Sequence, residues 1–189
     1  NKNIGKSEVK IERLWPGSLI GVINGLSFFK KYWDKNNNFK LFDFASFDKK
    51  KNLIIHGRLD DVINIRGHRI GSAEIESALL KINYLSECAA IGVKDELEGQ
   101  VLVIFYSSTK NKSLSNEINS ELIKRFGTFS VPKEIVKISE VPKTRSGKIL
   151  RRLLRSIYES PKSKNHGDLS TILNKKIIPQ IRKALLNKK

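Results

Sequence analysis

Methionine is absent from the 189 residues, and cysteine occurs once, at Cys88. A single cysteine excludes an intrachain disulfide framework and a cysteine-based metal cluster, and its place in the apolar run 88–93 predicts a position in the core of a strand. No apolar run approaches the ~20 residues that a membrane-spanning helix needs, and no signal peptide is visible. These absences predict a cytoplasmic protein. Because the sequence opens without methionine, we expect a fragment or truncated copy of a longer chain.

Acidic residues are scarce relative to basic ones, with 19 Asp and Glu against 36 Lys and Arg and a formal net charge of +17. Such an excess suits nucleic acid or an anionic membrane surface. It equally suits polyphosphate ligands such as ATP and coenzyme A, and it is compatible with ordinary solvated faces. The sequence lacks a zinc-ligand spacing, a helix-turn-helix signature and a basic patch interleaved with aromatic residues. We therefore expect neither a nucleic-acid partner nor a membrane partner.

Hydrophobic periodicity predicts an α+β fold. We expect residues 1–59 to be the β-rich end of a larger domain, residues 60–160 a small carboxyl-terminal domain, and residues 161–189 a tail. The small domain should contain a three-stranded sheet, a β-hairpin and flanking helices. The predicted strands are 19–23, 39–45, 53–56, 85–93, 100–107 and 134–138, with the hairpin over 62–65 and 68–70. The predicted helices are 73–82, 114–126, 149–158 and a terminal helix over 171–186 that is interrupted at Pro179, with one helical turn over 28–33.

Two polar stretches stand out from this periodic pattern. The first runs from Gly57 to Glu74 and contains a Gly-Arg-x-Asp-Asp turn, a strand and a tight Arg-Gly-His-Arg reversal. The second, residues 142–148, reads Pro-Lys-Thr-Arg-Ser-Gly-Lys, a composition typical of an exposed bend. By itself the second stretch could bind phosphate or serve as a basic targeting string. It is not a P-loop, because the required Gly-x-x-x-x-Gly-Lys-Ser/Thr spacing is missing.

Three charged residues near the first stretch each allow two interpretations. The forked guanidinium of Arg58 could hold ribose or phosphate oxygens, or form a surface salt bridge to Asp60 or Asp61. Asp43 could cap a turn, or accept two neighbouring hydroxyl groups together. Asp60 could form an Asx-turn, or act as a hinge that absorbs a change of backbone angles. The residues alone leave these alternatives open.

Taken together, the two stretches make the chain resemble the carboxyl-terminal part of an acyl-CoA synthetase of the adenylate-forming superfamily, closest to the acetyl-CoA/propionyl-CoA synthetase branch. The stretch Gly-Asp-Leu-Ser-Thr-Ile at 167–172 resembles a tail of this short-chain branch. The resemblance implies that residues 1–59 end an AMP-binding domain. It also implies that a short-chain carboxylate, acetate or propionate, reacts with ATP and Mg²⁺ to give an acyl-adenylate, which coenzyme A then converts to acyl-CoA plus AMP.

The resemblance also implies roles for individual residues. Lys148 would be the catalytic lysine, with its ammonium between the attacking carboxylate and the α-phosphate, and it would be the target of a lysine acetyltransferase and deacetylase. Asp43 would accept hydrogen bonds from the ribose, although Phe42 stands before it where the family usually has glycine. Arg58 and Arg69 would contact the nucleotide.

The remaining implied roles concern domain movement, coenzyme A and a metal ion. Asp60 would be the hinge. Gly67 would let the pantetheine arm pass close to the backbone, and Arg66, where the family commonly has serine, would contact coenzyme A. Backbone carbonyls of Leu80, Ile82 and Leu85 would hold a metal ion.

Several rival hypotheses remain. The chain alone is expected to be inactive in adenylation, because it has no glycine-rich phosphate loop and no acyl pocket motif. The alternatives are a basic module that binds nucleic acid or membranes, another adenylate-forming ligase, and a degenerate remnant.

Overall fold

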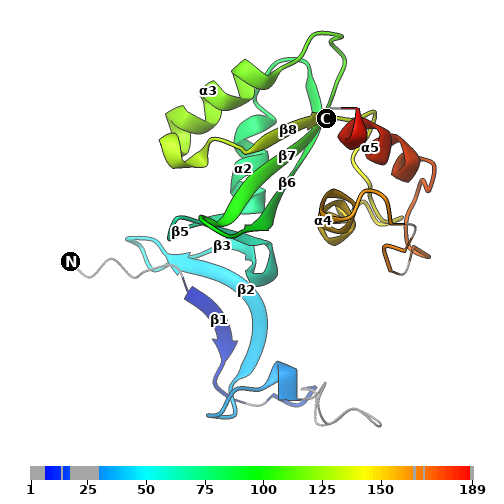
Figure 1. Ribbon diagram of the computed structural model, residues 1–189. Helices are drawn as coiled ribbons and strands as arrows, with labels where there is room; N and C mark the ends of the chain where they lie inside the picture. Colours follow the sequence, from blue (N-terminus) through cyan, green and yellow to red (C-terminus); the bar gives the residue numbers. More distant parts are fainter. Residues whose placement is uncertain (1–6, 14, 18–29, 164, 168, 188–189) are drawn as a thin grey trace. The chain divides into compact units, whose positions relative to one another are not determined.

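The computed structural model describes residues 7–13, 15–17, 30–163, 165–167 and 169–187 (Figure 1). The predicted strand 19–23 and the start of the aromatic helical turn 28–33 lie outside the described residues. The chain divides into two compact units, residues 1–60 and 61–189. Among the described residues, no helix is long and apolar enough to cross a membrane.

The first unit is built around an antiparallel sheet of three strands in the order β1-β2-β3. Its strands are β1 (Ser7–Ile11), β2 (Phe39–Phe47) and β3 (Leu53–Arg58). Asp48 shapes the turn between β2 and β3, because its Oδ1 accepts hydrogen bonds from the backbone N–H groups of Lys50 and Asn52, both at 2.8 Å. The hairpin predicted from the alternating residues is therefore confirmed.

The second unit contains the expected three-stranded sheet and β-hairpin. Strands β6 (Leu85–Asp95) and β7 (Gly99–Ser108) pair antiparallel, and β8 (Glu134–Lys137) pairs parallel with β7. The hairpin of β4 (Val62–Ile65) and β5 (His68–Gly71) joins β7 through the pair Ile65–Gly99, which makes one five-stranded sheet. A 3-10 turn, η1 (Leu59–Asp61), precedes β4.

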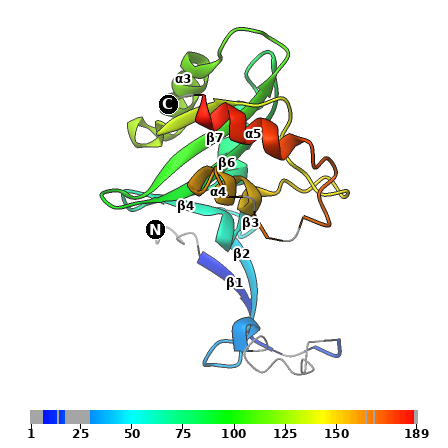
Figure 2. The ribbon, with the colours of Figure 1, turned by 45° about the vertical axis from the view of Figure 1, so that its right-hand side comes forward.

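Helices cover both faces of this sheet (Figures 1 and 2). One core contains residues of α2 (Ser72–Leu79) and α3 (Ser115–Phe126), and the other contains residues of α4 (Arg151–Glu159) and α5 (Ile177–Leu186). Alternate residues of β6 face the two cores, with Cys88 in the first and Ala89 in the second. Burial of both faces explains the continuous apolar runs of β6 and β7.

Cys88 occupies the strand core as predicted, with 3% of its surface exposed. Burial, together with the nearby negative charge of Glu76, raises the pKa of the Cys88 thiol to about 12. This cysteine is therefore a packing residue rather than a reactive thiolate.

The terminal helix differs from the prediction. Helix α5 begins at Ile177 rather than at residue 171, and it runs through Pro179 without interruption. The predicted break was wrong because Pro179 lies in the first helical turn, where backbone N–H groups have no partner within the helix and proline is tolerated. The side chains of α5 that face inward share one core with β6 and β7.

Candidate functional site

Lys148 lies at the end of a tight hairpin loop of residues 145–147. The backbone N–H of Thr144 donates to the oxygen of Lys148, and the N–H of Gly147 donates to the oxygen of Thr144, both at 2.9 Å. Gly147 has φ of +82°, so the loop is a turn closed by a glycine in the left-handed region. The Lys148 side chain is exposed. The sequence therefore places an ammonium group on a short and well-defined bend, as predicted.

The base of this hairpin is tied to the central sheet. Glu87 of β6 accepts a hydrogen bond from the N–H of Val141 at 2.9 Å and forms an ion pair with the Nζ of Lys143 at 2.5 Å. Burial alone would raise the pKa of Glu87, but the bonds from Lys143 and Val141 outweigh it and lower the pKa below its ordinary value. The carboxylate thus stays charged and holds the loop to the sheet.

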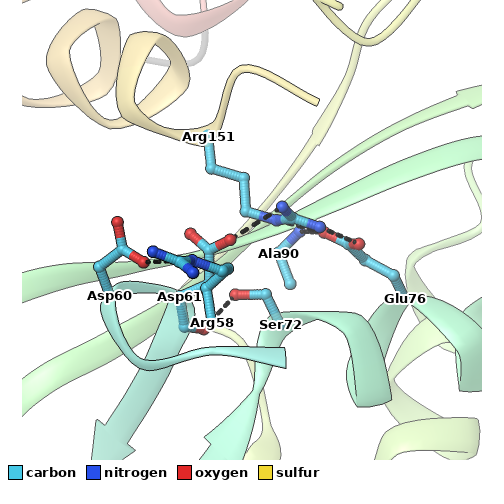
Figure 3. Close-up of polar contacts among 7 residues, drawn as sticks. All are labelled: Arg58, Asp60, Asp61, Ser72, Glu76, Ala90 and Arg151. Atoms are coloured by element: carbon cyan, nitrogen blue, oxygen red, sulfur yellow. Dashed lines mark hydrogen bonds and ion pairs between the residues drawn. The ribbon is translucent and has the colours of Figure 1, made fainter. Parts of the chain in front are cut away.

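Arg151, the first residue of α4, forms a partly buried charge cluster with two carboxylates (Figure 3). Its Nε and Nη2 donate to the two oxygens of Glu76 at 2.9 and 2.6 Å, and its Nη1 donates to Asp61 at 3.0 Å. Glu76 also accepts the backbone N–H of Ala90 at 3.0 Å. Burial alone would lower the pKa of Arg151, but the hydrogen bonds and negative charges of its partners raise it.

This cluster was missed by sequence reasoning. Its members lie on α2, on α4 and in the turn before β4, and no local pattern connects residues so far apart in the sequence. The only sequence signal is an acidic residue, Glu76, at a position next to the apolar face of α2. The cluster fixes the start of α4, three residues after Lys148, against Asp61, the first residue of the second unit.

Gly67 forms the turn of the β4–β5 hairpin together with Arg66. Both residues have positive φ, +49° for Arg66 and +86° for Gly67, as a two-residue hairpin turn of the primed type requires. A Cβ placed on Gly67 would meet nothing within 4 Å, so the space beside this backbone is open. Arg66 pairs with Glu98, while Arg69, on β5, has an exposed side chain.

A cavity of about 400 Å³ lies next to this turn in the second unit. Its polar rim contains Arg66, Glu98 and the ion pair between Asp95 and Lys133, with N and O atoms 2.8 Å apart. The hydrogen bond from Lys133 lowers the pKa of Asp95 to about 2, with help from two backbone N–H groups. Arg66, one of the two residues predicted to contact coenzyme A, thus lines a hollow whose rim carries both positive and negative charges.

In the first unit, Asp43 and Arg58 lie opposite each other in the β2–β3 ladder. The Nη1 of Arg58 donates to Asp43 at 3.2 Å and to the carbonyl of Leu41 at 2.7 Å. Its Nε lies 3.7 Å from the Oδ1 of Asp60 (Figure 3). The structure therefore contains the salt bridge to Asp60 that the sequence allowed, and it adds one to Asp43. The Arg58 side chain is half exposed, at 50%, so the pair can still reach a ligand.

Phe42 adopts φ of +58°, a conformation that glycine enters freely and a bulky residue rarely adopts. The position where glycine was expected thus keeps the backbone shape of glycine. The cost is offset in part by the cations of Lys31, Lys40 and Arg58, which lie 5.6 to 5.9 Å from the centre of the Phe42 ring.

The predicted hinge and metal residues lie in connections or at the start of a strand. Asp60 is exposed within η1, and the division between the two units falls directly after it. Leu80 and Ile82 follow the end of α2, and Leu85 begins β6. The carbonyl of Ile82 accepts the N–H of Leu85 at 3.2 Å. Carbonyl oxygens at a helix end, where the dipole is negative, are donors of the type that a hard cation prefers, so their chemistry fits the predicted metal.

Three comparisons relate the chain to known proteins. Residues 74–148 match the family described as AMP-binding enzyme C-terminal domain. Acetyl-coenzyme A synthetase 1 of Debaryomyces hansenii is 38% identical over 178 residues, which are 90% of this chain and 26% of that protein. Acetyl-coenzyme A synthetase 1 of Candida albicans is 36% identical, with the same coverage. The chain thus spans about a quarter of the length of these relatives.

Solved structures share the fold. Acetoacetyl-CoA synthetase from Streptomyces lividans superposes with a TM-score of 0.80 at 17% identity, covering 99% of this chain and 29% of that one. An ATP-bound RpMatB-BxBclM chimera gives 0.71 at 21% identity, covering 82% and 31%. Identities this low support the fold alone.

Proposed function

We propose, from the match of residues 74–148 to the family described as AMP-binding enzyme C-terminal domain, that this chain is the carboxyl-terminal part of an ATP-dependent acetyl-CoA or propionyl-CoA synthetase. Such an enzyme joins a short-chain carboxylate to ATP, releases pyrophosphate, and then transfers the acyl group to coenzyme A with release of AMP. Support comes from the relatives named acetyl-coenzyme A synthetase at 36–38% identity. The substrates and the AMP-forming ligase activity of the whole protein are part of this proposal.

The observation that carries the proposal is the exposed Lys148 on its braced hairpin. A carboxylate that attacks the α-phosphate of ATP brings two anions together, and at 4 Å their repulsion is about 4 kcal/mol in a medium of effective dielectric 20. A fixed ammonium between the two anions offsets this repulsion as charge develops in the transition state. Lysine suits this task, since its ammonium has three donors and needs no proton transfer.

The second half-reaction would use other residues of the same domain. Rotation about Asp60 would withdraw Lys148 and present the turn at Gly67, beside which the backbone is open to a thin ligand such as the pantetheine arm. Arg66 would contact coenzyme A after leaving its ion pair with Glu98. Asp43 and Arg58 would hold the ribose and Arg69 the phosphate. A bound Mg²⁺ would supply charge neutralisation of the ATP phosphates, and the carbonyls of Leu80, Ile82 and Leu85 would hold a separate structural metal ion.

Regulation through Lys148 belongs to the same proposal. The exposed side chain is accessible to a lysine acetyltransferase and a deacetylase. Acetylation would remove the charge and should stop adenylation while leaving the domain folded. A cytoplasmic location likewise remains a prediction.

The rival hypotheses have less support. A basic module for nucleic acid or membranes rests on net charge alone, whereas the family match and the relatives favour the ligase. Another adenylate-forming ligase is distinguished by its acyl pocket, which lies outside the predicted domain of residues 60–160. A degenerate remnant would keep the fold but lose the contribution of Lys148.

The test is a fusion enzyme in which this chain replaces the matching carboxyl-terminal part of the Debaryomyces hansenii acetyl-coenzyme A synthetase 1. We expect the fusion enzyme to form AMP from ATP only when acetate and coenzyme A are present. Lys148→Ala should abolish this activity. Lys112→Ala, at an exposed lysine between β7 and α3, should not. Equal activity in the two variants, or a folded but inactive fusion enzyme, would refute the proposal.

A further inference from the structure

The end of the stretch 167–172 has no part in the proposed function, yet its residues Thr171 and Ile172 lie directly against the hairpin that carries Lys148. Asp168 falls outside the described residues. Ile172 forms an antiparallel bridge with Thr144. On either side of this bridge, the N–H of Leu173 donates to the oxygen of Lys143 at 2.9 Å, and the oxygen of Thr171 accepts the N–H of Arg145 at 3.3 Å. Residues 171–173, the tail strand, therefore lie alongside the hairpin as a short third segment, joined to it by this isolated bridge and these two hydrogen bonds.

A third strand matters because a two-stranded hairpin by itself is at best marginally stable in water. The hairpin's own pairing is short, with a bridge between Lys143 and Ile149 and the bonds around the loop. The bonds from Glu87 reach only Val141 and Lys143, at the base of the hairpin. The backbone of the tail strand forms hydrogen bonds with the backbone of Lys143 and of Arg145, the residues on either side of Thr144. It thus reaches the arm that leads into the loop, close to Lys148.

The tail strand is itself fixed to the core. Ile172 is 4% exposed and packs in the core that contains the inner side chains of α4 and α5. Asn174 follows, and its side chain bonds to Glu140 and accepts the N–H of Lys176. The side chain of Leu173, in contrast, is 69% exposed. Leu173 therefore contributes to the hairpin chiefly through its backbone.

We propose that residues 171–173 are a positioning strand for Lys148. The strand holds the hairpin in the one shape that carries the amine to its reaction partner. Adenylation then depends on the strand, whereas acyl transfer to coenzyme A, from which Lys148 is withdrawn, does not. This inference rests on the proposed function for its catalytic part, but its structural part can be tested on the chain alone.

The structural test uses Leu173→Pro, which removes the N–H that bonds to Lys143 and leaves no buried side chain changed. Leu173→Ala is the matched control, since it keeps the N–H. Amide hydrogen exchange of the chain should show the amides of Arg145, Gly147 and Lys148 exchanging about tenfold faster in Leu173→Pro, the effect of losing one hydrogen bond. The exchange rates of the core amides of β6 and β7 should be the same in both variants. Loop amides that exchange equally in both variants would overturn the proposal.

A second variant guards against failure of Leu173→Pro to fold. Ile172→Val removes one methylene from the anchor of the tail strand and is small enough for the core to tolerate. The loop amides should again lose more protection than the amides of β7. An equal loss in both places would mean that Ile172 serves only the core, and the positioning strand would be rejected.

The catalytic test uses the fusion enzyme. Leu173→Pro should lower kcat for ATP–pyrophosphate exchange by about tenfold or more, since small misplacements of reacting groups cost up to ~100-fold. KM for ATP and acyl transfer from supplied acetyl-adenylate should change less than about twofold, as expected when only the transition state of one step is affected. If both half-reactions fall together, the strand is merely structural. If Lys148→Ala itself retains exchange activity, the proposed function fails, and the exchange rates of the loop amides still decide whether the strand braces the loop.

Discussion

Replacement of Arg151 should destabilise the second unit strongly. Arg151→Met keeps most of the stem volume but removes the guanidinium, whose partners are Glu76 and Asp61. The Glu76 side chain is 9% exposed, so it would remain almost buried as an unpaired carboxylate. Breaking a buried pair in this way costs about 3–5 kcal/mol. The cost should lie near the lower end of that range, because Glu76 keeps its bond from the N–H of Ala90.

The measurement is the free energy of opening, from amide exchange of the most protected residues of β7, because those amides report the second unit alone. A double variant, Arg151→Met with Glu76→Leu, is the matched comparison. Replacing both charged partners with apolar residues is often close to neutral, although Asp61 would then lose its partner. The double variant should therefore be more stable than Arg151→Met. A cost below about 1 kcal/mol for Arg151→Met, or simple additivity of the two changes, would refute this reasoning.

Three further predictions concern the loop, acid and the thiol. Gly147→Ala should lower the free energy of opening of the loop by about 1–2 kcal/mol, because alanine is strained in the left-handed backbone conformation of residue 147. The added Cβ meets no atom within 4 Å, so no steric clash contributes. An unchanged rate of amide exchange at residue 147 would contradict this. The pKa of Glu87 is lowered from its ordinary 4.5, so its stabilisation should be complete above that pH and vanish as pH falls through the lower folded pKa; the stability gap between the chain and Glu87→Gln, measured by urea titration, should shrink in acid. Cys88, with a pKa of about 12, should resist iodoacetamide at pH ~8 until the chain is unfolded, and rapid alkylation of the folded chain would show that the thiol is not buried.

Much of the site could be predicted because its features are local. Gly147 and Gly67 mark turns that need positive φ, and the structure has both. The exposure of Lys148 follows from the polar bend that precedes it. The apolar runs of β6 and β7 are typical of a sheet covered on both faces, and helices cover both. Patterns of this kind depend on neighbours within a few residues.

The rest could not be predicted because it depends on contacts between distant segments. Arg151 meets Glu76 across 75 positions, and nothing in either segment indicates the partner. Thr171 and Leu173 were assigned to a helix, since no local pattern reveals that their backbone pairs with the hairpin of Lys148. Pro179 suggested a break only because the start of α5 was placed too early.

In the proposed mechanism, the amine of Lys148 serves adenylation and has no part in acyl transfer. This division of roles is tested most directly by the ratio of two rates in the Lys148→Ala fusion enzyme, ATP–pyrophosphate exchange with acetate and acetyl-CoA formation from supplied acetyl-adenylate. We predict that exchange falls by about 100-fold or more, as loss of a fixed charge at the transition state implies, while acetyl-CoA formation stays within about twofold. A parallel fall of both rates, or no fall in exchange, would contradict the account.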